Sequence, residues 1–147
     1  MNSESLTDGQ RPLEWHLDVT LCETTEIGAV VAAVSDAMIA VGYSSEDIFG
    51  MGLVLDEAIC NAIKHGNRHD PTKKVHVRCH VAFDRVESEI EDEGDGFDPR
   101  LVPDPLAPEN RERTSGRGLF LMRRYATQVR FSERGNRVAV TRHRART

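Results

Sequence analysis

Glu57 and Asn61 form the polar pair in this sequence that first suggests chemistry. They lie four residues apart in a segment, residues 53–67, in which many of the other members are apolar. In a helix this spacing puts both side chains on one face, one turn apart. A carboxylate and an amide buried there need partners, because burial without hydrogen bonds costs several kcal/mol. The pair therefore either caps a core helix within the protein or has a ligand as its partner.

A second group of residues, Asp92, Gly94 and Gly96, follows a predicted strand. Glycine lets the backbone turn tightly and approach a flat base closely. The carboxylate of Asp92 can accept a hydrogen bond from an exocyclic amino group such as that of adenine. In the first group, the amide oxygen of Asn61 suits Mg²⁺, and a carboxylate one turn away can deprotonate an attacking hydroxyl.

A third group opens a predicted helix with the run Gly116-Arg117-Gly118-Leu119. Backbone N–H groups at a helix N-terminus suit phosphate. Each group alone is weak evidence, because turns use glycine freely and helix surfaces often carry polar pairs. All three in this order, with a long loop between the second and the third, indicate a nucleotide site.

The elements that must position these groups follow from hydrophobic periodicity. The order strand, helix, helix, strand, strand, loop, helix, strand, strand predicts an α+β fold. We expect a two-layer sandwich in which helices cover one face of a mixed or antiparallel sheet. Thr24 or Thr25 is expected to cap the first helix, Gly42 to end it, and Ser44 to begin the second. The predicted ranges are 13–21, 27–41, 44–65, 75–83, 86–91, 116–126, 128–133 and 137–142.

Length and composition predict one folded domain, residues 12–147, after a disordered polar leader at 1–11. Residues 98–115 hold four of the six prolines and are interpreted as a lid. A net charge of -5 argues against direct nucleic-acid binding. No apolar run approaches the length of a membrane span. The three scattered cysteines are typical of reduced thiols in a cytoplasmic protein.

With these motifs the chain resembles the GHKL (Bergerat-fold) ATPases, the superfamily of DNA gyrase and the histidine kinases. Residues 57–66 are similar to its N box, residues 92–99 to its first glycine box, and residues 116–122 to its second. The resemblance covers about residues 13–143. It is strongest to the stand-alone anti-sigma factor serine/threonine kinases, because of the single small domain and the runs at 61–67 and 116–123.

This resemblance implies ATP and Mg²⁺ as cofactors and assigns roles by position. Asn61 would coordinate the metal, Glu57 would be the catalytic base, and Asp92 would bind the adenine amino group. Further nucleotide contacts would come from two pocket glycines, from the phosphate-binding run and from one of two lid arginines, which the sequence does not distinguish. These residues are Gly94, Gly96, Gly116, Arg117, Gly118, Leu119, and Arg111 or Arg113.

The resemblance also implies a partner switch. The protein would be a cytoplasmic Mg·ATP-dependent serine/threonine kinase that either holds a sigma factor or phosphorylates an anti-anti-sigma protein of the STAS-domain type. A homodimer is expected, and neither a membrane nor nucleic acid is an expected partner. Two alternatives stay open: an ATP- or ADP-binding module that gates a protein partner without catalysis, and a detached histidine kinase catalytic domain.

Two further patterns are interpreted as surface features. His76 and His80 share a strand face but lie about 13 Å apart, too far for one metal ion. Arg142, Arg144 and Arg146 are interpreted as a solubilising tail.

Overall fold

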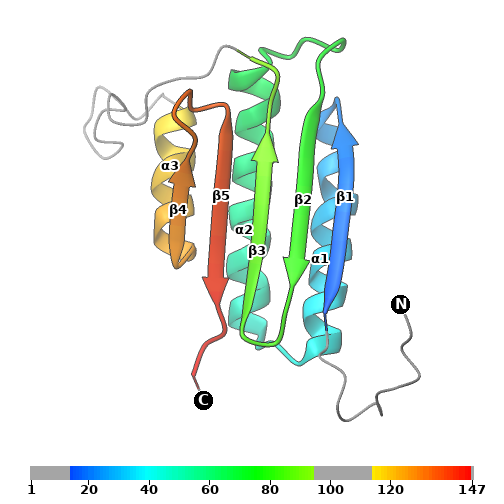
Figure 1. Cartoon of the computed structure of the whole chain (residues 1–147), viewed down its shortest axis with the longest axis vertical. Helices are drawn as coiled ribbons and strands as arrows, with labels where there is room; N and C mark the ends of the chain where they lie inside the picture. The colour runs from blue at the N-terminus through cyan, green and yellow to red at the C-terminus, as the bar shows by residue number, and fades with distance from the viewer. Residues whose placement is uncertain (1–13, 95–113, 147) are drawn as a thin grey trace.

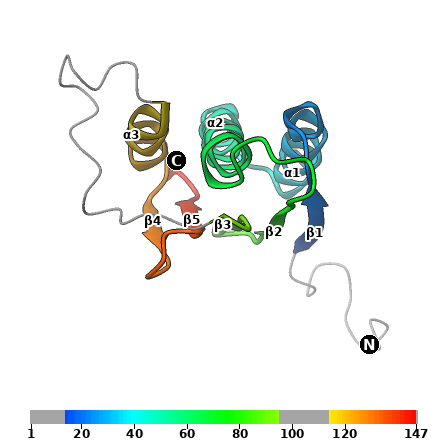
Figure 2. The same ribbon diagram turned by 90° about the horizontal axis from the view of Figure 1, so that it is seen from above.

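The computed structural model describes residues 14–94 and 114–146. Five antiparallel strands form one sheet in the order β1-β2-β3-β5-β4. The three α-helices cover one face of this sheet (Figures 1 and 2), which confirms the predicted two-layer α+β sandwich. The elements are β1 (Trp15–Leu21), α1 (Ile27–Val41), α2 (Ser45–Asn61), β2 (Val75–Val81), β3 (Arg85–Glu91), α3 (Thr114–Tyr125), β4 (Gln128–Phe131) and β5 (Arg137–His143).

Alternation along the strands decides which side chains meet the helices. Val75, Val77, Cys79 and Val81 of β2 are buried against the helices, whereas His76, Arg78 and His80, which alternate with them, lie on the opposite face. Burying one such valine is worth about 1.5–3 kcal/mol, so a slip of one residue in register would lose several of these contributions at once. The predicted strand is therefore confirmed, with its end at Val81.

The helix ends follow local sequence signals. Gly42 ends α1 in the left-handed conformation at φ 89°, and Ser44 caps α2 by accepting a hydrogen bond from the Asp47 N–H at 3.1 Å. The expected threonine cap of α1 is wrong. Thr24–Glu26 is instead a 3-10 turn leading into α1, and the Glu26 side chain accepts the N–H of Glu23 at 3.0 Å.

The second helix changes its hydrogen bonding where a single helix was predicted to continue. After Asn61 the chain forms one π-helical turn, η3 (Ala62–Gly66), which the Asn67 N–H closes on the carbonyl of Ala62 at 2.8 Å. Arg68 and His69 then adopt positive φ angles of 52° and 58°. Single π-helical turns occur frequently at functional sites.

One described segment, Thr24–Val41, is long and apolar enough to span a membrane, with a mean hydropathy of 1.5. This corrects the expectation that no apolar run approaches that length. In the fold, Ile27, Val34 and Met38 of this segment are buried in the core. Its apolar side therefore packs within the domain.

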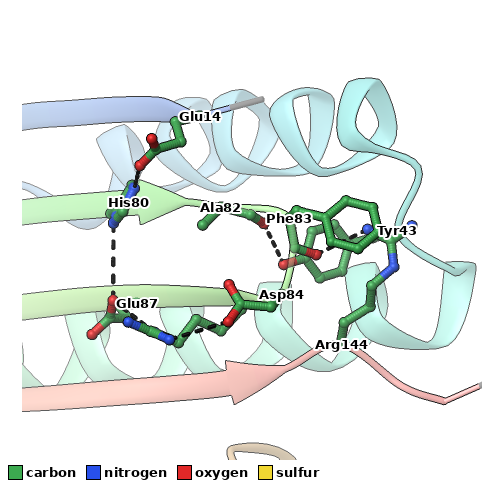
Figure 3. A network of polar contacts seen from close by, with 9 residues as sticks. Glu14, Tyr43, His80, Ala82, Phe83, Asp84, Glu87 and Arg144 are labelled. Atoms are coloured by element: carbon green, nitrogen blue, oxygen red, sulfur yellow. Dashed lines mark hydrogen bonds and ion pairs between the residues drawn. The ribbon is translucent and has the colours of Figure 1, made fainter. Parts of the chain in front are cut away.

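The expected arginine tail is also wrong at two of its three positions. Arg142 Nε donates to the buried carboxylate of Asp47 at 3.0 Å. Arg144 lies over the rings of Tyr43 and Phe83, with its guanidinium carbon 4.7 and 4.4 Å from their centroids. These contacts fix residues 142–144 to the end of the sheet where α2 begins, and Figure 3 shows Arg144 beside Tyr43 and Phe83.

Candidate functional site

Glu57 and Asn61 lie one turn apart on α2, as their spacing predicts. Glu57 is half-buried, and burial raises the pKa of its carboxyl above the ordinary value. The neighbouring Asp56 raises this pKa further, while Lys64 lowers it. The side-chain oxygen of Asn61 is buried and has no hydrogen-bond partner among the described residues. Such an oxygen costs about 1–3 kcal/mol, and the described residues leave it unsatisfied.

Asp92 lies against the π-helical turn that follows Asn61. A methyl group on Gly66 would lie 2.2 Å from Asp92 Oδ2, and one on Gly94 would lie 1.8 Å from the carbonyl oxygen of Gly66. Only hydrogen fits at both positions, so η3 and the loop after β3 are in direct contact. The turn that follows the first predicted group is therefore in contact with the loop that carries the second.

A hydrogen bond fixes the orientation of the Asp92 carboxyl. Its Oδ1 accepts the Gly94 N–H at 2.8 Å. Burial raises the pKa of this carboxyl above its ordinary value, the Gly94 hydrogen bond lowers it, Glu91 raises it, and Arg134 lowers it. The burial effect is the largest of these. A polar edge that entered this site would meet an acceptor already fixed in orientation.

Asn67 is a site residue that the sequence analysis did not assign. Its side chain is 3% exposed. Its Oδ1 accepts the Glu93 N–H at 2.8 Å, and its Nδ2 donates to the Lys74 carbonyl at 3.1 Å. Asn67 thus ties the end of η3 to the loop that carries Asp92. The sequence signal for this role is the position of Asn67, an amide residue directly after Gly66, where the helix ends.

The β4–β5 loop supports the same loop from the other side. The Asp92 N–H donates to the Asn136 carbonyl at 2.9 Å, and Asn136 Nδ2 reaches the Asp92 carbonyl at 3.4 Å. Arg134 Nη2 reaches the Gly94 carbonyl at 3.4 Å. The backbone around Asp92 is therefore held by groups from two separate parts of the chain.

The third predicted group lies on α3, which packs against α2. The start of α3, the end of α2 and the end of β3 all lie at the same end of the molecule (Figure 1). The helix begins at Thr114, two residues before the predicted start. Gly116 and Arg117 are in its first turn. Gly118 and Leu119 come after that turn, and the Leu119 side chain is 7% exposed in the core. Gly96, Arg111 and Arg113 are outside the described residues.

The donor set fits a nucleotide with a hard cation. An unpartnered buried amide oxygen is the type of oxygen ligand that Mg²⁺ accepts. A held carboxylate in a glycine-lined contact suits the amino edge of a base. A half-buried glutamate with a raised pKa is typical of a general base.

A family model described as the histidine kinase-like ATPase domain matches residues 21–142. The chain belongs to the histidine kinase-like ATPase family. Within this family it groups with serine-protein kinases named RsbW. It is 34% identical to the RsbW of Bacillus licheniformis over 110 residues, which cover 71% of this chain and 69% of the relative. It is 30% identical to the RsbW of Bacillus subtilis strain 168 over 124 residues, which cover 80% and 78%.

A solved structure is similar in fold. It contains the RsbU and RsbW domains of a Mycobacterium tuberculosis protein, with a TM-score of 0.58 and 17% sequence identity. The match covers 90% of this chain and 34% of that one. The resemblance inferred from the three motif groups is thereby confirmed at the level of family and fold.

Proposed function

We propose that this protein is a Mg·ATP-dependent serine/threonine protein kinase that takes part in a partner switch. It would phosphorylate an anti-anti-sigma protein of the STAS-domain type and, in its other state, hold a sigma factor. The buried oxygen of Asn61, which has no partner among the described residues and lies one turn from a half-buried Glu57, is the observation that carries the proposal. The serine-protein kinase names of the relatives support it.

In this proposal each group has a separate task. Asn61 would hold Mg²⁺, which, when bound, neutralises phosphate charge during transfer. Glu57 would accept the proton of the substrate hydroxyl, and a raised pKa brings a carboxylate closer to the strength that proton transfer near neutral pH requires. Asp92 would bind the adenine amino group. The packed helix α2 would keep Glu57 and Asn61 in fixed positions.

The proposal also assigns residues that would contact the phosphates of ATP. The first turn of α3, with Gly116 and Arg117, would face the phosphates through backbone N–H groups. Gly118 and Leu119, which follow the first turn of the helix, would complete this phosphate-binding run. Arg111 or Arg113 would bring positive charge to the γ-phosphate, and Gly96 would complete the adenine loop. We further propose a homodimer that works in the cytoplasm without direct contact to nucleic acid or membrane.

The test is phosphate transfer to a candidate anti-anti-sigma protein from the same genome. With ATP and Mg²⁺ the parent should label serine or threonine, giving a phosphate that is stable in acid. Glu57→Gln should lower the transfer rate by about 10²- to 10⁴-fold and leave ATP affinity nearly unchanged. Glu46→Gln is the matched control, because it removes an exposed carboxylate in the first turn of the same helix, far from Glu57, and should transfer at the parent's rate.

Two results would contradict the proposal. If ATP binds tightly but no candidate partner is labelled, the regulatory module without catalysis is the better interpretation. A label that is stable in alkali and labile in acid would instead indicate phosphohistidine and a detached histidine kinase domain. Transfer by Glu57→Gln at the parent's rate would remove Glu57 from the role of base.

A further inference from the structure

Two histidines meet on the face of the sheet that the described helices leave uncovered; Figure 2 shows the helices on the opposite face. His16 of β1 and His80 of β2 are directly opposite each other in the antiparallel register. Their rings are stacked, with centroids 4.3 Å apart and planes 6° from parallel. Spacing along the sequence relates His80 only to His76 on the same strand. His16 is far from His80 in the chain, and the two residues meet only through strand pairing.

Two carboxylates flank the His80 ring, one at each nitrogen (Figure 3). Nε2 of His80 is 2.6 Å from Glu14 Oε1, and Nδ1 is 3.9 Å from Glu87 Oε1. One ligand atom from each of Glu14, His16 and His80 lies within 4.8 Å of the others. Two imidazoles and a carboxylate are a common zinc ligand set, with the fourth position left to water.

We propose that Glu14, His16 and His80 bind a divalent transition-metal ion, with zinc as the preferred ion, on the uncovered face of the sheet. Glu87 would be the outer partner. A carboxylate at the non-ligating nitrogen of a histidine fixes its tautomer and ring orientation. Glu87 stands near Nδ1, so Nε2 is left to the metal, next to the Glu14 oxygen that it already meets.

The side chains have room to close on an ion. Zinc ligands lie about 2.0–2.1 Å from the metal and so about 3.3 Å from one another in a tetrahedral site. Separations of up to 4.8 Å therefore need to shrink by at most about 1.5 Å, whereas the 2.6 Å between His80 Nε2 and Glu14 Oε1 must widen slightly. The stacked rings must also turn so that their nitrogens converge. His16 is exposed, and the side chains of Glu14 and His80 are 44% and 30% exposed. His16, His80 and Glu87 line a shallow depression of about 440 Å³ that leaves space for a bound water.

The site is separate from the proposed nucleotide site, which uses α2, α3 and the loop after β3. Its donors include imidazole nitrogens, which suit zinc better than Mg²⁺. The inference therefore does not rest on the proposed kinase activity and can fail or hold independently of it.

The experiment is calorimetric titration of zinc chloride into untagged full-length protein at pH 7.5, with Mg²⁺ present in excess. One ion should bind per chain with micromolar affinity. His16→Ala and His80→Ala should each weaken binding by more than tenfold, and Glu87→Gln by about tenfold as an outer partner. His76→Ala is the matched control, because His76 lies on the same strand and face but meets Asp18 rather than a second imidazole. It should bind like the parent.

A second measurement identifies the ligands directly. Cobalt(II) in place of zinc should give tetrahedral absorption bands with the parent and with His76→Ala, and these should be lost with His16→Ala. The exposed positions of these side chains keep the variants folded, which circular dichroism checks. Absence of zinc binding overturns the proposal. So does zinc binding that survives in the His16→Ala, His80→Ala double variant, since the ion would then reside on thiols such as Cys22 or Cys60.

Discussion

The replacement Gly66→Ala tests whether the contact between η3 and Asp92 controls nucleotide affinity. Gly66 is not among the described glycines with a positive φ, so the backbone there accepts alanine without strain. Any effect must come from the added methyl group. That group would lie 2.2 Å from Oδ2 and 2.3 Å from Cγ of Asp92.

The size of the effect follows from these distances. Ordinary contact begins near 3.4 Å, so the Asp92 carboxylate must retreat by about 1 Å. This movement also strains its hydrogen bond from the Gly94 N–H. A hydrogen bond to a charged group is worth about 1.5–3 kcal/mol, which corresponds to about 10- to 100-fold in a dissociation constant. We therefore expect ATP to bind Gly66→Ala 10- to 100-fold more weakly than the parent, about the loss expected for Asp92→Asn.

Calorimetric titration with ATP and Mg²⁺ measures this change, and a double-mutant cycle assigns it. If Gly66→Ala acts through the carboxylate, adding it to Asp92→Asn should cost little more than Asp92→Asn alone. Gly28→Ala is the control, since a methyl group there meets nothing within 4 Å. Its ATP affinity should equal the parent's. Full affinity of Gly66→Ala, or additive losses in the double variant, would refute the reasoning.

Four further predictions concern stability. Asp47→Ala leaves Arg142 without its buried partner and should lower the unfolding free energy by about 3–5 kcal/mol in urea. Asn67→Ala removes two hydrogen bonds at a buried position and should cost about 1–3 kcal/mol, with weaker ATP binding in calorimetry. The pKa of Glu57 is raised above its ordinary value of 4.5, so the folded state binds this proton more tightly than the unfolded chain. Stability from this group therefore falls as the pH rises from 4.5 through the raised pKa, and Glu57→Gln should lack that fall in urea titrations across this range. Asn61→Ala removes an oxygen that has no hydrogen-bond partner among the described residues, so it should not lower the unfolding free energy and should raise it by up to about 1–3 kcal/mol. It should also abolish the part of the ATP-induced rise in Tm that depends on Mg²⁺.

Features encoded by neighbouring residues could be predicted from the sequence. The alternation of β2 and the stop at Gly42 depend on local patterns, and both were found within two residues of their observed positions. The pairing of Glu57 with Asn61 is of the same kind, because four residues along a helix make one turn. Local periodicity was sufficient for the order of the elements and for the layer arrangement.

Features made by distant residues could not be predicted in this way. The π-helical turn accompanies the packing of Gly66 against Asp92, which lies in the loop after β3. The arginine at 142 has the charge of a surface residue, yet its partner Asp47 lies 95 positions away and is 1% exposed. The role of Asn67 likewise depends on its hydrogen bonds to backbone groups of two loops. In each case the deciding contact depends on the assembled sheet.

The helix that carries Glu57 and Asn61 is fixed at both ends, and this arrangement offsets what the site costs. Near its start, Asp47 is paired with Arg142 of β5, and beyond its end, Gly66 lies against Asp92. Between these anchors are an unpartnered amide oxygen and a carboxyl with a raised pKa, both unfavourable to the folded state. A flexible helix could relieve both by moving them toward water. Holding α2 in place keeps these groups poorly solvated, so that a cation and a substrate hydroxyl would find them already oriented.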